Sequence, residues 1–357
     1  IKFTVVQFYL LLIFIFSIFI FFGSGINFAS TRSLFNYMQL FFVSFVGYQI
    51  LKTERINFEF FLKSTIVVWL LVGFIQTFIN NSFLTFLTRD PRFLGETRGA
   101  VSLAAEPTFY GIVLLFFILF LFHSNYKYKV FFVFISLFGI IFFAKSSMVF
   151  LFLIIMIFFY FLTHLSIRSL FYMIILLLVI PFLILELMPT SRMAYLISET
   201  LSETLSETSQ GNLFIDLSVI DRVYHIFFSL KGFYDNFMLP NGFLSWQPFM
   251  SSQIEKYSSL GIISPDYVNH PARAKGSRIM SGYGSAFFEL GIISLLIPFG
   301  LIKLYYSLYK NDLKKFFFFS LFVNAIMFSG IPIGFSIFAF YIGFLIYLIQ
   351  KRKYSVK

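Results

Sequence analysis

The chain has 357 residues, of which 59% are hydrophobic and 12% are charged, and it carries a formal net charge of +11 and no cysteine. Soluble domains are about one quarter charged and under half apolar, so a water-soluble fold is excluded, as are disulfides, thiolate metal sites and thiol nucleophiles. A mean hydropathy of +0.87 and 58 phenylalanines indicate a chain whose solvent is lipid. We therefore expect an integral membrane protein.

Apolar runs recur along the sequence on both sides of one long polar stretch. Several are shorter than the about 20 residues of a comfortable span, so their neighbours must help or the membrane must thin. The first run has no small-residue cleavage site after it, so we interpret it as a first span rather than a signal peptide. Two separations are short, at 144–146 and 329–331, and we interpret both as hairpin turns. The sequence thus predicts an all-α integral membrane protein, a bundle of about ten transmembrane helices. The predicted spans are Val5–Phe22, Leu34–Leu51, Phe58–Ile79, Pro107–Phe122, Val130–Phe143, Ser147–Thr163, Leu170–Met188, Phe287–Leu308, Phe316–Phe328 and Pro332–Gln350.

Polarity divides the chain into three parts. Residues 1–188 hold seven predicted spans joined by short loops, residues 189–285 form the longest polar stretch, and residues 286–357 hold three more spans and a basic tail. A connection as long as the second part is usually functional or disordered. Because it carries Trp246, further aromatic residues and an amphipathic run over Leu217–Leu230, we expect this large loop to be mostly folded.

Basic residues are distributed unequally between the two sides of the predicted membrane. Fifteen of the 27 lysines and arginines lie on the side of the N-terminus, where only Glu54, Glu59 and Asp312 oppose them. This is the positive-inside pattern, so we expect both termini in the cytoplasm and the large loop outside. Because topology accounts for the excess positive charge, we expect no nucleic-acid partner.

Arginine is concentrated on the outer side, where short loops usually avoid it. Its planar, permanently charged fork suits phosphate, so the set as a whole predicts a lipid-linked phosphate or pyrophosphate as ligand. Taken singly, each arginine is better explained by pairing with a nearby acid or a lipid headgroup. The set comprises Arg89, Arg92 and Arg98 in the charged loop 80–106, and Arg222, Arg273, Lys275 and Arg278 near the ends of the large loop.

Glu106 stands at the start of the fourth predicted span, just before Pro107. An acid followed by proline at the first helical position is a good helix start, and this alone explains the pair. A carboxylate at a membrane boundary is also a functional candidate, and it would suit the role of proton acceptor. His225 and His270, in the large loop, are each either a base or a polar surface residue, and for either one alone we expect the surface.

Several kinds of catalytic site have no counterpart in the sequence. No HExxH, paired-histidine or aspartate-rich spacing occurs, so a metal site built by the protein is not expected. The sequence also has no P-loop and no GxSxG turn. ATP hydrolysis and serine-esterase chemistry are therefore unsupported.

Three stretches of the outer side share their patterns with a known family. The first is Arg98-Gly-Ala-Val-Ser-Leu-Ala-Ala-Glu106-Pro-Thr, at the outer start of a span. The second is Asp221-Arg222-Val-Tyr-His-Ile-Phe-Phe followed by Leu239-Pro-Asn-Gly242-Phe, early in the large loop. The third is Ser281-Gly-Tyr-Gly-Ser-Ala-Phe-Phe-Glu289-Leu-Gly-Ile-Ile, at the entry to the next span. In this order, the three resemble the bacterial O-antigen and related polysaccharide polymerases of the Wzy type and, more distantly, the O-antigen ligases.

Two features favour the polymerase branch. Where the ligases resemble one another in a His-Asn pair, nine residues before the position of Glu289, this sequence has Met280-Ser281. Ligases also tend toward Pro-Asn where this sequence has Glu106-Pro-Thr. The second glycine of the family's Gly-x-Gly run is missing, with Ser245 near its place, so the geometry of that loop stays open.

The resemblance implies an all-helical bundle of the GT-C type in the bacterial inner membrane, with its active site on the periplasmic face. It implies a hexosyltransferase-type enzyme that moves a growing glycan from undecaprenyl pyrophosphate onto a second lipid-linked repeat unit. Because the donor is already activated, no nucleotide, metal or other cofactor is expected. The implied partners are the lipid-linked oligosaccharide donor and acceptor, membrane lipids, a chain-length regulator and a flippase.

The resemblance also implies roles for individual residues. Arginines would hold the pyrophosphate or stabilise the departing charge, a carboxylate or histidine would take the proton of the attacking hydroxyl, and aromatic rings would stack on sugars. The arginines are Arg98, Arg222, Arg273 and Arg278, with Arg89 and Arg92 as further substrate-binding residues. The base is Glu106 or, failing it, His270, and the rings are Trp246, Tyr267 and Tyr283.

Two other functions remain open. An O-antigen ligase would share much of this pattern, and a lipid-linked oligosaccharide transporter or flippase would share the membrane bundle. A transporter predicts broken helices and ionisable residues near mid-membrane, whereas the polar residues here are concentrated on one face. A purely structural membrane protein would not need the set of outer arginines.

Overall fold

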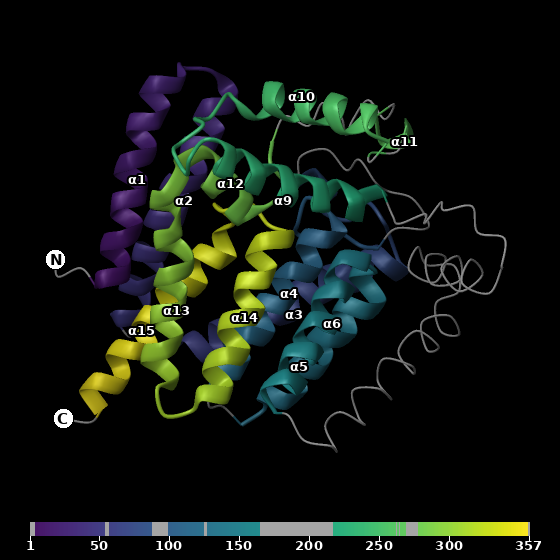
Figure 1. The fold of residues 1–357 in the computed structure, drawn as a ribbon. Coiled ribbons are helices and arrows are strands. Elements are labelled where there is room, and N and C mark those ends of the chain that lie inside the picture. Colours follow the sequence, from purple (N-terminus) through teal and green to yellow (C-terminus); the bar gives the residue numbers. More distant parts are fainter. Residues whose placement is uncertain are drawn as a thin grey trace. The chain divides into compact units, whose positions relative to one another are not determined.

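The computed structural model describes residues 4–53, 57–87, 99–124, 127–164, 217–261, 263, 265–268 and 278–355. Within these ranges the regular secondary structure is helical, with no β-strand (Figure 1). The chain forms two compact units, the first made of Ile1–Lys52 and Leu217–Lys357, the second of Thr53–Asp216. The predicted all-α class is confirmed for the described residues.

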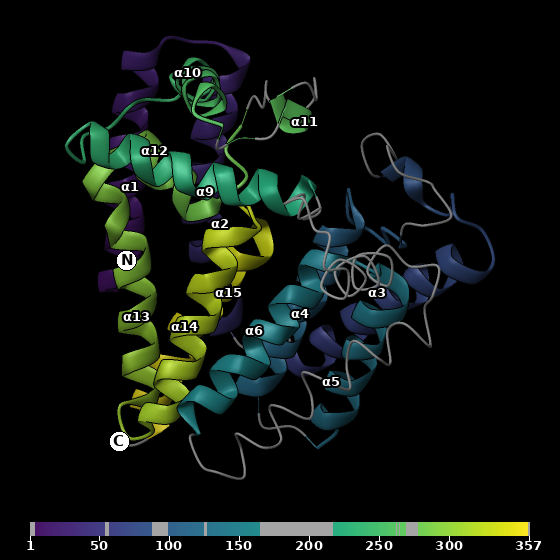
Figure 2. The same cartoon turned by 45° about the vertical axis from the view of Figure 1, so that its right-hand side comes forward.

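The first unit is built around helix α2, which packs along α15 and against α1. The close approach of α2 and α15 depends on small residues, because a Cβ added to Gly343 would lie 2.4 Å from the backbone oxygen of Ser44. Helices α9 and α10 lie across the end of this unit at which α1 connects to α2 (Figures 1 and 2). The helices are α1 (Val5–Ser24), α2 (Phe28–Lys52), α9 (Leu217–Asp235), α10 (Trp246–Ser259), α11 (Pro265–Val268), α12 (Gly282–Leu290), α13 (Leu296–Tyr309), α14 (Leu313–Ser329) and α15 (Ser336–Ser355).

The second unit is centred on α4, whose side chains are nearly all buried from Pro107 to Leu121. A helix that is apolar on every side is typical of the interior of a helical bundle, and α4 packs against α3, α5 and α6. The elements are α3 (Phe58–Phe78), the short turn η1 (Thr85–Leu87), α4 (Pro107–His123), α5 (Lys129–Phe138), its π-helical continuation η2 (Gly139–Ala144) and α6 (Ser147–Thr163).

Among the residues that the structure describes, four segments are long and apolar enough to cross a membrane: Val5–Ser24, Phe28–Lys52, Phe58–Phe78 and Gly282–Tyr309. Three shorter apolar helices accompany them, Pro107–His123, Lys129–Ala144 and Ser147–Thr163. Large apolar side chains on these helices are exposed, as a lipid-facing surface requires: Phe19 is 68% exposed and Phe60 is 71% exposed. The chain is therefore a multi-pass membrane protein, while the total of about ten spans and the GT-C grouping stay predictions. The predicted span Leu170–Met188 lies outside the described residues.

The two short separations between predicted spans, at 144–146 and 329–331, have different outcomes in the structure. The turn at 144–146 is confirmed, because η2 ends at Ala144, Lys145 adopts a left-handed φ of 44° and α6 begins at Ser147. At the second separation, α14 ends at Ser329 and α15 begins only at Ser336.

The prediction that a span begins at Pro332 was therefore wrong. The carbonyl of Pro332 accepts from the N–H of Phe335 at 3.0 Å and closes a turn before α15 begins. A Cβ added to Gly334 would lie only 2.5 Å from the Cα of Asn36. The connection between α14 and α15 thus packs closely on the backbone of α2.

Candidate functional site

A carboxylate is buried inside the first unit at the C-terminal end of α12. The Glu289 residue is only 9% exposed. Its Oε1 accepts a hydrogen bond from the hydroxyl of Ser33 at 2.9 Å, and its Oε2 accepts one from the hydroxyl of Tyr37 at 2.6 Å. Burying a carboxylate is costly unless it is hydrogen-bonded or paired with a charge, and here both oxygens have a donor from α2.

One arginine lies near this carboxylate, and a second lies near the first. Arg32, one residue before Ser33, interacts electrostatically with both Glu289 and Arg278. Arg32 is half-buried and Arg278 is exposed. Two guanidinium groups and one buried carboxylate thus cluster at the N-terminal end of α2, with positive groups in excess. Because guanidinium forks bind phosphate and carboxylate groups in two-pronged fashion, this arrangement suits an anionic ligand.

The Leu239-Pro-Asn-Gly242 segment docks on the end of α12. The backbone N–H of Asn241 donates to the carbonyl of Phe288 at 3.0 Å, and the N–H of Gly242 donates to the carbonyl of Glu289 at 3.3 Å. The last carbonyls of a helix have no partner within it, so this loop satisfies them. Two of the three sequence patterns, which are separate along the chain, therefore meet at Glu289.

Gly291 makes this docking possible. Its φ is 64°, and a Cβ at this position would lie 2.5 Å from the carbonyl oxygen of Met238. The ring of Phe243, at the end of the same loop, stacks on Tyr37 with centroids 6.0 Å apart. Ser245, which stands where the family pattern has its second glycine, has a φ of −80°, so that position needs no glycine here. Its hydroxyl donates to the carbonyl of Asn241 at 2.5 Å and holds the loop closed.

A polar network ties α9 to its neighbours. His225 is only 2% exposed, and its Nδ1 accepts from the backbone N–H of Met280 at 3.1 Å. The neutral ring then carries its proton on Nε2, which lies 3.5 Å from Oδ1 of Asp221. The same oxygen accepts from the hydroxyl of Tyr267 at 2.7 Å. The prediction of a surface position for His225 was wrong, because its ring is needed to join α9 to Met280.

Aromatic residues predicted to stack on sugars lie in the core. Trp246 is 4% exposed, and Tyr267 and Tyr283 are fully buried. Trp246 packs edge-on against Phe288 with centroids 5.2 Å apart, and the Tyr283 hydroxyl donates to Oδ1 of Asn324 at 2.7 Å. Their rings therefore offer no open face to a sugar in this structure, and they support α12 instead.

Glu106 lies in the second unit, half-buried at the start of α4. It occupies the position before Pro107, yet its side chain makes no capping hydrogen bond. The segment leading to it is fixed by Gln76, whose Oε1 accepts from the backbone N–H groups of Val101 and Ser102 at 3.1 and 2.6 Å. Its Nε2 donates to the carbonyls of Phe83 and Ser102 at 2.7 and 3.1 Å. One buried amide thus shapes the backbone on which Glu106 stands.

The remaining predicted site residues are divided between described and undescribed parts of the chain. Arg222 is half-buried on α9, and Arg278 is exposed just before α12. Arg89, Arg92, Arg98, His270 and Arg273 lie outside the described residues.

The site residues predicted from sequence do not include Arg32, Ser33 or Tyr37, and no role was predicted for Glu289. A signal for the α2 residues exists, since Ser30, Ser33 and Tyr37 recur three and four positions apart along the helix. Such spacing places polar side chains on one helical face, where a buried partner is needed.

Within the described ranges, no group of three or more His, Cys, Asp or Glu residues is arranged to hold a metal ion. No protein-family model, curated protein or solved structure matches this chain.

Proposed function

We propose that this protein is a periplasmic-face glycosyltransferase of the inner membrane, a polymerase that joins undecaprenyl-pyrophosphate-linked repeat units of O-antigen or a related surface polysaccharide. The observation that carries the proposal is the buried Glu289 carboxylate beside Arg32, which in turn lies near Arg278, at one end of apolar helices. A positive site at that depth matches a pyrophosphate attached to a membrane-embedded lipid. The three sequence patterns that resemble the Wzy-type polymerases support the same reaction.

The proposed step is a substitution at the anomeric carbon of the donor glycan. A hydroxyl oxygen of the acceptor unit forms a bond to that carbon, while the bond from the carbon to the pyrophosphate oxygen breaks. The hydroxyl proton passes to a base, and undecaprenyl pyrophosphate leaves with the bonding electron pair. Negative charge grows on the leaving oxygen, so fixed cations near it lower the barrier.

In the first unit, Arg32 and Arg278 would bind the pyrophosphate. Glu289 would act on Arg32 as a positioning residue, because its two oxygens are held by Ser33 and Tyr37 and its charge attracts the guanidinium. Fixing a binding group before the substrate arrives avoids reorganisation during the reaction.

The other residues predicted from sequence are separate candidates for roles in the same reaction. Arg222 is a further cation on α9, and Glu106 is the candidate base, with His270 as the alternative. A positioned general base contributes about 10²- to 10⁴-fold to a rate. The other predicted phosphate-binding residues are Arg89, Arg92, Arg98 and Arg273.

The test is an assay of purified protein in lipid vesicles with synthetic undecaprenyl-pyrophosphate repeat units. We expect a ladder of lipid-linked oligomers without added nucleotide or metal, and we expect Arg32→Ala and Arg278→Ala to abolish it while the protein stays folded. Lys256→Ala, which removes an exposed cation from α10, is the matched control and should leave the ladder intact.

Other outcomes would assign another function. A ladder that survives both arginine variants would contradict the proposed pyrophosphate site. Transfer of glycan to a lipid A core acceptor, with no ladder, would identify a ligase. Movement of intact lipid-linked units across the vesicle membrane, without either transfer, would identify a transporter.

A further inference from the structure

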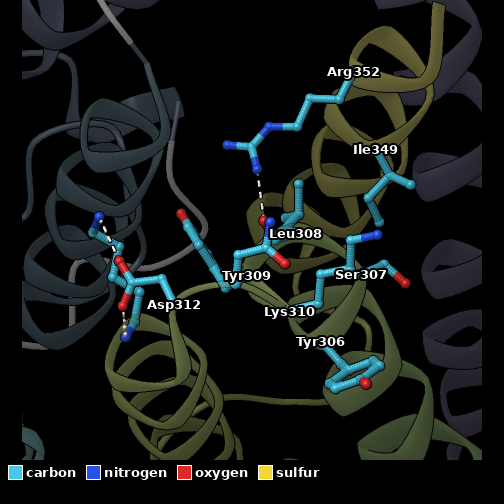
Figure 3. Close-up of a pocket in the computed structure, with 10 residues that line it drawn as sticks. Tyr306, Ser307, Leu308, Tyr309, Lys310, Asp312, Ile349 and Arg352 are labelled. Atoms are coloured by element: carbon cyan, nitrogen blue, oxygen red, sulfur yellow. Dashed lines mark hydrogen bonds and ion pairs between the residues drawn. The ribbon is translucent and has the colours of Figure 1, made fainter. Parts of the chain in front are cut away.

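A pocket of about 810 Å³ lies at the other end of α13 from the Glu289 site. It is formed where α13 ends, α14 begins and α15 passes alongside (Figure 3). Apolar carbon from Leu308, Ile349 and the rings of Tyr306 and Tyr309 makes up much of its lining. The polar lining residues are Ser307, Lys310, Asn311, Asp312, Lys315 and Arg352.

The charges around this pocket are unbalanced. Asp312 is engaged by its own helix, since it accepts from the backbone N–H of Lys315 at 3.1 Å and pairs with the Lys315 ammonium at 2.8 Å. The Lys315 ammonium thus balances the negative charge of Asp312. Lys310 and Arg352 contribute two more positive charges to the same pocket.

Arg352 is held in place over the pocket. Its Nη1 donates to the carbonyl of Leu308 at 2.6 Å, and its guanidinium lies 5.8 Å from the centroid of the Tyr309 ring (Figure 3). A guanidinium has five N–H donors, and the bond to Leu308 orients the group through one of them. A fixed cation of this kind loses little side-chain freedom when an anion binds.

We propose that this pocket binds the phosphate headgroup of an anionic phospholipid of the cytoplasmic leaflet, independently of the transferase proposal. The distribution of basic residues places this end of the unit on the cytoplasmic side, where the leaflet is anionic and basic pockets between helices recognise lipid headgroups. The phosphate contacts Lys310 and Arg352, and the glycerol and first acyl carbons lie against Leu308, Ile349 and Tyr306.

The experiment is native mass spectrometry of the full chain in detergent, titrated separately with phosphatidylglycerol and phosphatidylcholine. We expect the wild type to prefer phosphatidylglycerol, and Lys310→Gln with Arg352→Gln to weaken that binding about 30-fold. The matched control is Lys314→Gln with Lys351→Gln, which removes the same charge from neighbouring positions that do not line the pocket. It should retain phosphatidylglycerol binding within about twofold.

Because Arg352 also caps α13, the single variant Lys310→Gln provides a second test. Lys310 is exposed, so the fold should persist, and binding should weaken about fivefold. Equal weakening in the pocket and control variants, or no weakening in Lys310→Gln, would overturn the proposal. Displacement of the lipid by millimolar inorganic phosphate would overturn the lipid assignment in favour of a soluble phosphate ligand.

Discussion

The hydroxyl of Tyr37 donates a hydrogen bond of 2.6 Å to Oε2 of Glu289, joining α2 to α12 across 252 residues of sequence. The hydroxyl of Ser33, one turn earlier on α2, donates a hydrogen bond to the other carboxylate oxygen. The carboxylate is thus fixed from one side, and its charge is directed toward Arg32. If the proposed transfer reaction is correct, the rate should depend on this arrangement.

We predict that Glu289→Gln lowers the rate of oligomer formation by about 100-fold. The amide has nearly the same shape but no charge, so Arg32 loses the attraction that positions it. The rate is measured in the vesicle assay, with unfolding in denaturant as the check on folding. Glu255→Gln changes an exposed carboxylate of α10 in the same way and should have no effect. An unchanged rate in Glu289→Gln would rule out the positioning role.

Removal of the Tyr37 hydroxyl tests the support of that carboxylate. Tyr37→Phe should destabilise the protein by about 1–3 kcal/mol, because it takes a donor from a buried charged group, and it should also slow transfer. Tyr305→Phe is the matched control, since it removes a buried hydroxyl that bonds to the hydroxyl of Tyr341 at 2.9 Å. We expect a comparable loss of stability from the control and no change in transfer. Equal transfer rates in Tyr37→Phe and Tyr305→Phe would show that the Tyr37 hydroxyl has no role in the reaction.

The packing of α9 on α12 depends on the absence of a side chain at Gly284. A Cβ there would lie 2.3 Å from the hydroxyl oxygen of Ser229, so Gly284→Ala should lower the free energy of unfolding. Ser229→Ala removes that oxygen, and the double variant should recover part of the loss, with a coupling energy of about 0.5–3 kcal/mol. The four proteins of this cycle are compared by denaturant unfolding. Strict additivity would show that the two helices do not meet at this pair.

Gln76 should be essential to the backbone that precedes Glu106. Gln76→Leu leaves the N–H groups of Val101 and Ser102 without their acceptor, and each unsatisfied buried group costs about 1–3 kcal/mol. Gln39→Leu is the control, because the hydrogen bond from Gln39 to Ser336 is exposed and its loss should cost little. Hydrogen exchange at residues 99–106 should quicken in Gln76→Leu alone. Unchanged exchange there would show that other contacts hold the segment.

The sequence contains clear signals for some of these features. Composition and apolar runs predict a helical membrane protein, because each run buries its own backbone hydrogen bonds and needs no distant partner. The turn at Lys145 was likewise predicted from a short interruption between two runs. The start assigned at Pro332 was wrong because hydropathy does not register the turn closed between Pro332 and Phe335 or the close approach of Gly334 to α2.

Only part of the candidate site was predicted from the sequence. Arg222 and Arg278 stood out as outer arginines, and the patterns around Gly242 and Glu289 were recognised separately. Nothing in the local sequence indicates that the carbonyl of Glu289 meets the N–H of Gly242, or that His225 is buried against Met280. Such contacts depend on where helices pack, and packing is decided by side chains far apart in the chain.

The sequence by itself therefore determined that the solvent of the chain is lipid and that its class is helical, since these follow from composition and from spacing within one segment. Only the tertiary structure decided that Ser33 and Tyr37 hold Glu289, that Arg32 joins Arg278 beside it, and that Arg352 closes a basic pocket at the opposite end of α13. The physical reason is the cost of burying charge, which must be met by donors and counter-charges that folding brings from distant helices.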